Sequence, residues 1–204
     1  MTRAPAAVVF DVGNVLYGWD PDRFFAARIA DPQERSRFLA ASGFMAWHNE
    51  LDAGRAFAEA AHDLSGRFPE YAGLIHAWSD DFGSTITGPV PGVHEIVDEL
   101  DERGVPLFAI TNFSADLWAP FAAREEAFFA RFRDIVVSGH VKMLKPDPAI
   151  YRLALDRFGL APGEALFIDD RPINVHGAEA LGMRGQVFTC ADDLRRRLEV
   201  EGVL

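Results

Sequence analysis

The chain of 204 residues contains a single cysteine, Cys190, and no apolar run near the roughly 20 residues that a membrane-spanning helix requires. One cysteine excludes an internal disulfide framework and a metal cluster built from cysteine. Basic residues are also few, since 20 Lys and Arg stand against 31 Asp and Glu, which gives a net charge of -11. The phosphate backbone of nucleic acids repels such a chain, so nucleic acid is not expected as a partner.

The apolar segment near the amino terminus is too short to be the hydrophobic region of a signal peptide. We therefore expect a cytoplasmic protein without a membrane partner, and the sequence favours no particular oligomeric state. The composition is 49% hydrophobic and 12% aromatic. This supplies enough apolar material for the core of one domain, or of one domain that carries an insertion.

Five short, mostly apolar runs are typical of buried strands, and they cover residues 7–10, 107–110, 135–137, 165–168 and 186–188. Apolar residues with helical spacing lie between these runs, at 93–100, 150–158 and 178–181. Alternating strands and helices predict an α/β fold with a Rossmann-like parallel sheet covered by helices on both faces.

One region interrupts this alternation. From about Pro21 to Gly83 the apolar residues have helical periodicity, and no convincing strand occurs. We therefore expect a core domain made of residues 1–17 and 89–204, with an all-helical cap domain at residues 18–88. A lid inserted at this point can close over the carboxyl ends of the strands, where ligands bind in such sheets.

Polar side chains follow three of the predicted strands. Asp11 follows the first strand, Thr111 and Asn112 follow the second, and Asp169 and Asp170 follow the fourth. Because the carboxyl ends of parallel strands meet at one edge of a sheet, we expect these groups to converge. Three carboxylates at one edge repel each other, and a divalent cation with a preference for oxygen ligands, Mg²⁺, would remove that repulsion.

A further loop offers Lys145 just before a predicted helix. Lys145 is favoured over Lys142 because Pro146 and Pro148 fix its loop beside the start of that helix. Lysine and threonine side chains suit phosphate oxygens, and a carboxylate held beside a cation can attack phosphorus. The pattern therefore predicts phosphoryl transfer through an aspartyl-phosphate.

Four motifs stand in order at these positions: Asp11-Val12-Gly13-Asn14, Thr111-Asn112, Lys145-Pro146 and Asp169-Asp170. Together they resemble the haloacid dehalogenase-like hydrolases over nearly the whole chain, and the helical insertion is similar to the cap of that family. The resemblance implies Asp11 as the nucleophile and Thr111, with Asn112, as the phosphate-binding residues. It implies Lys145 as the cation that holds the phosphate and the nucleophile together.

The same resemblance implies a Mg²⁺ site. Asp170 is similar to the direct metal ligand of the family, and Asp169 to the residue that orients bound water. Asp11 and the main-chain carbonyl of Gly13 complete the implied set of metal-binding residues.

Gly13 is also where the sequence departs from the family pattern. Phosphatases of that family mostly carry a second Asp at this position, which protonates the leaving group and then activates water. Loss of a general acid costs on the order of 10²–10⁴ in rate. The cost shrinks for a leaving group that is a weaker base, such as the anomeric hydroxyl of a sugar. The Asp-x-Gly-Asn sequence also resembles bacterial α-D-glucose-1-phosphate phosphatases, so we expect a Mg²⁺-dependent phosphatase that acts on a small phosphorylated metabolite, a sugar phosphate.

The segment 47–55 is dense in polar residues around one glycine. His48 in this segment is a candidate proton donor in place of the missing acid. A solvated connection between two helices explains the same segment equally well.

Two other functions compete. A 2-haloacid dehalogenase has the same fold but needs no metal, and such enzymes resemble a pattern with serine at the position of Asp169. A non-catalytic interaction protein could keep the fold after losing the acid, although the retained nucleophile, lysine and acid pair argue against it. A signalling receiver domain is excluded because its acid pair precedes the phosphorylated Asp.

Overall fold

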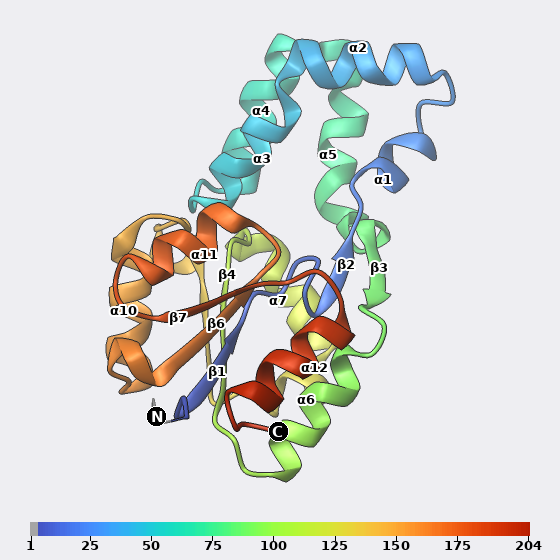
Figure 1. The fold of residues 1–204 in the computed structure, drawn as a ribbon. Coiled ribbons are helices and arrows are strands. Elements are labelled where there is room, and N and C mark those ends of the chain that lie inside the picture. Colours follow the sequence, from blue (N-terminus) through green and yellow to red (C-terminus); the bar gives the residue numbers. More distant parts are fainter. Residues whose placement is uncertain (1–3) are drawn as a thin grey trace.

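The computed structural model describes residues 4–204 and contains a five-stranded parallel sheet in the order β5-β4-β1-β6-β7 (Figure 1). Its strands are β1 (Ala7–Phe10), β4 (Leu107–Thr111), β5 (Asp134–Val137), β6 (Ala165–Asp169) and β7 (Arg184–Val187). The α/β prediction is therefore confirmed. The last strand begins two residues before the predicted run, because β7 lies at the sheet edge and its residues are only half-buried.

Helices cover both faces of this sheet. Val8 and Phe10 of β1 pack into one apolar cluster, whereas Ala7 and Val9 pack into the other, as the alternation of side chains along a strand requires. The first cluster includes residues of α6 (Val93–Glu102), α7 (Ala115–Arg124) and α12 (Ala191–Val200), and the second includes residues of α10 (Pro148–Phe158) and α11 (Pro172–Glu179). The short elements α8 (Glu126–Phe129), α9 (Ser138–Val141) and η3 (Pro162–Glu164) complete the sheet layer.

Helix α10 shows how the sequence sets the ends of these elements. Its amino end is capped by Asp147, whose side chain accepts a hydrogen bond of 2.8 Å from the Ala149 amide, and Pro148 occupies the first turn. Gly159 ends the helix in the left-handed conformation, with a φ of 66°. The cap at Asp147 fixes the end of the loop that carries Lys145.

A helical insertion lies beyond the carboxyl edge of the sheet (Figure 1). It contains α1 (Asp22–Ala26), α2 (Pro32–Ser42), α3 (Phe44–Asp52), α4 (Phe57–Arg67), α5 (Ala72–Asp80) and the short 3-10 helices η1 (Pro69–Tyr71) and η2 (Phe82–Thr85). Its interior is aromatic: the Trp78 ring stacks on Phe25 at 5.5 Å and meets Phe44 edge-on at 4.9 Å. The absence of strands predicted for 21–83 agrees with these elements.

The chain enters and leaves this insertion through two strands that the sequence pattern did not indicate. These are β2 (Tyr17–Trp19) and β3 (Ile86–Pro89), which pair antiparallel. They are short, partly exposed and contain Gly18 and Gly88, so they lack the apolar run that marks a buried strand. The predicted domain boundaries at residues 18 and 88 fall inside this strand pair. No helix within residues 4–204 has the length and apolar character needed to cross a bilayer.

Candidate functional site

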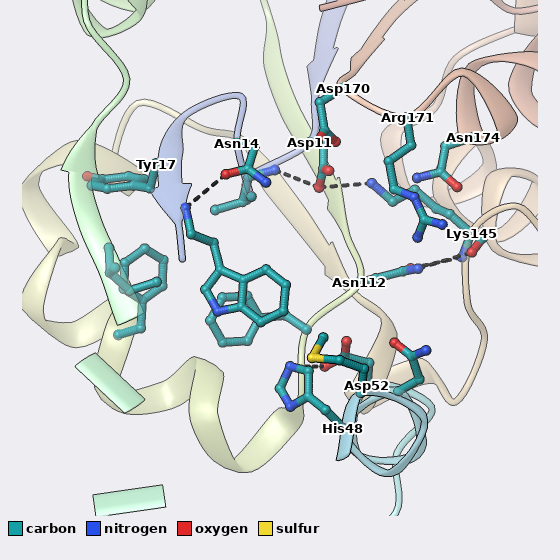
Figure 2. Close-up of a pocket in the computed structure, with 18 of the residues that line it drawn as sticks. Asp11, Asn14, Tyr17, His48, Asp52, Asn112, Lys145, Asp170, Arg171 and Asn174 are labelled. Atoms are coloured by element: carbon teal, nitrogen blue, oxygen red, sulfur yellow. Dashed lines mark hydrogen bonds and ion pairs between the residues drawn. The ribbon is translucent and has the colours of Figure 1, made fainter. Parts of the chain in front are cut away.

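Three acids and one lysine meet at the carboxyl edge of the sheet, and Figure 2 shows Asp11, Asp170 and Lys145 of this group. Asp11 follows β1, Asp169 ends β6, and Asp170 comes next; one carboxylate oxygen from each lies within 4.8 Å of the others. The buried Lys145 ammonium Nζ is 2.9 Å from Asp11 Oδ1 and 2.6 Å from Asp169 Oδ2. The sequence therefore identified groups that the fold brings together.

Asn112 holds the loop of Lys145 in place. Its side-chain amide donates a hydrogen bond of 3.0 Å to the Lys145 carbonyl, and its side-chain oxygen accepts one of 2.9 Å from the Lys145 amide. Lys142 is exposed and takes no part in this cluster. Of the two lysines, Lys145 is therefore the one that lies in the cluster of acids.

The carboxylate of Asp169 is nearly saturated by protein donors. Besides Lys145, it accepts hydrogen bonds from the Arg171 amide at 2.9 Å and from Asn174 Nδ2 at 3.0 and 3.1 Å. Asp170 is only half-buried and accepts a hydrogen bond from the Asn14 side chain. Asp11 and Asp170 therefore keep more free oxygen capacity for a cation than Asp169 does.

Electrostatics also favour a cation here. Burial raises the pKa of Asp11, against the opposing effect of the Lys145 ammonium, and Asp169 raises it further. Burial also raises the pKa of Asp170, with a further contribution from Asp169. Burial lowers the pKa of Lys145, but Asp11 and Asp169 together outweigh it and hold that pKa above its ordinary value. Three carboxylates against one ammonium leave excess negative charge, and an all-oxygen donor set fits Mg²⁺.

Two further predicted site residues, Thr111 and Gly13, stand in different relations to the cavity above the acids. Thr111 is the last residue of β4, is buried, and pairs in register with Val137. It is not among the residues that line the cavity above the acids, so its phosphate-binding role stays a prediction. Gly13 does line that cavity, and a Cβ built on it would have no heavy atom within 4 Å. Space for a side chain is therefore present where the family's second acid is missing.

The acids form one end of a cavity of about 330 Å³ between the sheet edge and the helical insertion. The remaining walls are largely aromatic and apolar, and they comprise Tyr17, Trp19, Met45, His48, Asn49, Asp52, Phe82, Ile86, Phe113 and Phe121. Several of these residues come from helix α3, which ends at Asp52. The cavity therefore joins a charged end and a mainly apolar end.

His48 is buried at the apolar end, with its ring between two others. It stacks on Trp19 at 5.5 Å and on Phe82 at 6.1 Å, and its Nδ1 has no hydrogen-bond partner within residues 4–204. Burial lowers the pKa of His48 to about 4. The imidazole is therefore uncharged at neutral pH, and its 3.9 Å approach to Asp52 is not an ion pair under those conditions.

Sequence reasoning missed Asn14 and Asp52 as parts of this cavity. Asn14 stands in the first motif with a φ of 55°, a conformation that asparagine tolerates better than most residues, and its side-chain oxygen accepts a hydrogen bond of 2.9 Å from the Trp19 amide. Its place beside Gly13 was a usable signal. Asp52 lies in the polar segment 47–55 but was not singled out within it, because a polar residue at the end of a helix is more often solvated than buried.

A family model matches most of the chain. Residues 5–182 match the model of the haloacid dehalogenase-like hydrolases. The phosphoserine phosphatase of Thermus thermophilus is 36% identical over 136 residues, which cover 64% of this chain and 51% of that protein. Phosphoglycolate phosphatase 1 of Pseudomonas aeruginosa is 29% identical over 200 residues, which cover 92% of this chain and 71% of that protein. The chain spans about half or less of the first three curated relatives, at 51, 45 and 35% of their lengths.

Solved structures share the fold at lower identity. A magnesium complex of a HAD family enzyme from Bacteroides thetaiotaomicron has a TM-score of 0.72 at 20% identity, covering 97% of this chain and 99% of that one. The L-2-haloacid dehalogenase from Xanthobacter autotrophicus has a TM-score of 0.61 at 18% identity, covering 98% and 84%. These likenesses extend over both the sheet and the helical insertion.

Proposed function

The chain belongs to the haloacid dehalogenase-like hydrolases, and from that premise we propose that it is a Mg²⁺-dependent phosphatase of small phosphomonoesters. The observation that carries the proposal is the buried Lys145 ammonium between Asp11 and Asp169, with Asp170 beside them, at one end of the cavity. A phosphate group placed there would meet a cation and a carboxylate together.

In this proposal Asp11 attacks phosphorus. One of its oxygens is held by the Val12 amide at 2.7 Å and by Lys145, while the other has no hydrogen-bond partner within residues 4–204. Attack forms an aspartyl-phosphate and expels the alcohol, and water then cleaves that intermediate. Lys145 neutralises phosphate oxygens, with Thr111 and Asn112 as the further phosphate-binding residues.

Asp11, Asp170 and the Gly13 carbonyl would hold Mg²⁺, with Asp169 acting through bound water. When bound, the ion supplies positive charge to the phosphoryl oxygens. Asp169 is suited to an indirect role because its oxygens already accept several hydrogen bonds from the protein. The acid pair also argues against a 2-haloacid dehalogenase, whose reaction needs no metal.

We further propose a sugar phosphate as the substrate and a cytoplasmic location, with residues 18–88 acting as the cap. The cap end of the cavity offers aromatic faces, which suit the C–H surface of a sugar ring, and the polar side chains of His48, Asn49 and Asp52 for its hydroxyls.

A panel of phosphorylated metabolites, assayed with and without Mg²⁺, tests this function. We expect phosphate release that a chelator abolishes and added Mg²⁺ restores, fastest with sugar 1-phosphates. Chelator-resistant turnover of 2-chloropropionate would identify a dehalogenase instead. A folded protein that releases phosphate from no ester would point to a binding role.

A further inference from the structure

We propose that Asp52, at the end of helix α3, is the general acid and base that replaces the carboxyl group absent at Gly13. This proposal rests on the proposed phosphatase function, because it assigns the proton transfers of that reaction. Asp52 lines the same cavity as Asp11 but belongs to the helical insertion rather than to the sheet edge. Figure 2 shows Asp52 and His48 across the cavity from Asp11, Asp170 and Lys145.

Asp52 is fixed in place by the core. Its backbone carbonyl accepts a hydrogen bond of 2.6 Å from the Ser138 hydroxyl, and its carboxylate accepts one from the Ser114 backbone amide. Ser138 and Ser114 follow the two neighbouring strands β5 and β4. The side chain is only 11% exposed, and it lines the cavity. A group held from two sides at the cavity wall is positioned for one proton transfer rather than for general solvation.

Asp52 also lacks a cationic partner within residues 4–204, since Lys145 is engaged by Asp11 and Asp169 and the nearby His48 is uncharged at neutral pH. Burial raises the pKa of Asp52 to about 7; the Ser114 amide opposes the rise and the charge of Asp11 adds to it. A carboxyl group with such a pKa holds its proton in a large fraction of molecules near neutral pH and can also accept one.

The ionisable groups around Asp52 have separate places. Those lining the cavity are Asp11, Tyr17, His48, Lys145, Asp170 and Arg171. On the elements packed against α3, the charged and titratable side chains are exposed or half-buried at the surface, and they are Glu34, Arg35 and Arg37 of α2, Glu59, His62, Asp63 and Arg67 of α4, and His140 with Lys142 at α9. Arg55, just after α3, is held by Glu50, Glu59 and Asp63.

The proton balance of the reaction closes with this residue. In the first step an Asp11 oxygen bonds to phosphorus, the bond from phosphorus to the ester oxygen breaks, and the Asp52 proton goes to that oxygen to give the alcohol. In the second step the Asp52 carboxylate takes a proton from water as the water oxygen attacks phosphorus. The aspartyl-phosphate bond breaks, and Asp11, inorganic phosphate and protonated Asp52 are regenerated.

Leaving groups of different basicity test the assignment. Phenyl phosphate and 4-nitrophenyl phosphate have similar size, but only the phenolate of the first needs substantial protonation to leave. We expect Asp52→Asn to lower kcat/KM for phenyl phosphate by about 10²-fold or more and for 4-nitrophenyl phosphate by less than about tenfold. The phenyl phosphate activity of the native chain should fall as the pH rises above about 7, and this fall should be absent in Asp52→Asn.

Asp116→Asn is the matched control. The Asp116 carboxylate accepts a hydrogen bond of 2.8 Å from the Phe57 amide, so it also joins the core to the insertion, but it is exposed and does not line the cavity. If Asp52 only held the core and the insertion together, each variant would lower the phenyl phosphate and 4-nitrophenyl phosphate activities by equal factors. We expect Asp116→Asn to leave the ratio of the two activities unchanged.

A second variant separates chemistry from folding. Adding Gly13→Asp to Asp52→Asn should restore much of the phenyl phosphate activity, because position 13 has space for a side chain and the restored acid needs no contact made by Asp52. Equal losses on both esters in Asp52→Asn, or no rescue in the double variant, would overturn the role of Asp52 and leave the proposed phosphatase function standing. If the native chain shows no Mg²⁺-dependent turnover of either ester, the proposed function fails and this proposal fails with it.

Discussion

The two ends of the cavity treat their buried basic groups in opposite ways. At the sheet edge Lys145 is bonded to two carboxylates, and its pKa stays above the ordinary value despite burial. At the cap end His48 and Asp52 have no charged partner bonded to them within residues 4–204. Burial lowers the pKa of His48 and raises that of Asp52, and both shifts favour the uncharged form of the side chain. A buried base thus keeps its charge where carboxylates compensate it, as at Lys145, and loses it where they do not, as at His48. The sheet-edge end is suited to binding a cation, with Lys145 beside it for a phosphate oxygen, and the cap end is suited to moving a proton.

We expect the largest effect when the reactive group of the charged end is removed. Asp11→Asn should reduce phosphate release by about 10³-fold or more, because an amide cannot form the aspartyl-phosphate. Steady-state kinetics with saturating Mg²⁺ measure this loss. Asp134→Asn, which changes an acid of strand β5 that pairs with Arg157 at the surface, should keep the native rate. An active Asp11→Asn protein would remove the nucleophile from the proposal.

Removing the cation of that end should weaken the fold. Lys145→Met leaves Asp11 and Asp169 buried without their shared partner, which typically costs about 3–5 kcal/mol. We expect a lower free energy of unfolding in urea at pH 7.5, with part of the loss recovered by Mg²⁺. Lys142→Met changes an exposed lysine of the same loop and should have little effect. Similar stabilities of the two variants would contradict compensated burial at this end.

The uncompensated end should show its character in the pH dependence of stability. The pKa of His48 falls from 6.5 to about 4 on folding, so its contribution to stability is present above pH 6.5 and is lost as the pH falls toward 4. A shift of this size corresponds to roughly 3 kcal/mol. Asp52 acts in the opposite direction, because its pKa is raised to about 7 and its contribution is lost as the pH rises.

His48→Phe tests the first of these contributions, since the variant keeps a ring between Trp19 and Phe82 but cannot titrate. Its free energy of unfolding should fall less than that of the native chain between pH 6.5 and 4, as measured by denaturant titration at several pH values. His76→Phe, on the exposed face of α5, serves as the comparison and should follow the native curve. Parallel curves for all three proteins would place a charged imidazole in the cavity.

The smallest effect tests whether the two ends can exchange roles. Gly13→Asp moves an acid to the sheet edge, where a Cβ meets nothing within 4 Å. We expect it to speed hydrolysis of esters with strongly basic leaving groups by about tenfold or less and sugar 1-phosphates still less. Equal effects on both kinds of ester, in kcat/KM, would remove leaving-group basicity as the explanation of Gly13.

The residues of the charged end could be predicted from the sequence because the ends of buried strands can be recognised in it. A buried parallel strand is a short apolar run, and the polar residue that ends or follows this run, as at Asp169 and Asp11, must lie at one sheet edge. Lys145 could be chosen through the prolines that follow it. The hydrogen bonds of Asn112 and Asn174 depend on side-chain directions, which no periodicity encodes.

The cap end could be predicted as helical, with His48 in the polar segment 47–55 as a candidate, but its side-chain contacts could not be predicted. Helical spacing gives the buried face of α3, but the burial of Asp52 depends on hydrogen bonds to Ser114 and Ser138, which lie more than 60 residues away in the sequence. The strands β2 and β3 were missed because their pairing, rather than an apolar pattern, makes them strands. Long-range contacts between polar groups therefore set the limit of sequence reasoning here.

The strand pair β2 and β3 has a mechanical consequence. Both passages of the backbone between the sheet and the insertion run through these adjacent strands, so the covalent connections of the insertion lie side by side. At the end of helix α3, the hydroxyl of Ser138 donates a hydrogen bond to the backbone carbonyl of Asp52 and so holds the insertion against the sheet domain. The position of the Asp52 carboxyl is therefore coupled to the contact between helix α3 and the sheet domain, so a change in that contact would also change where a proton can be delivered.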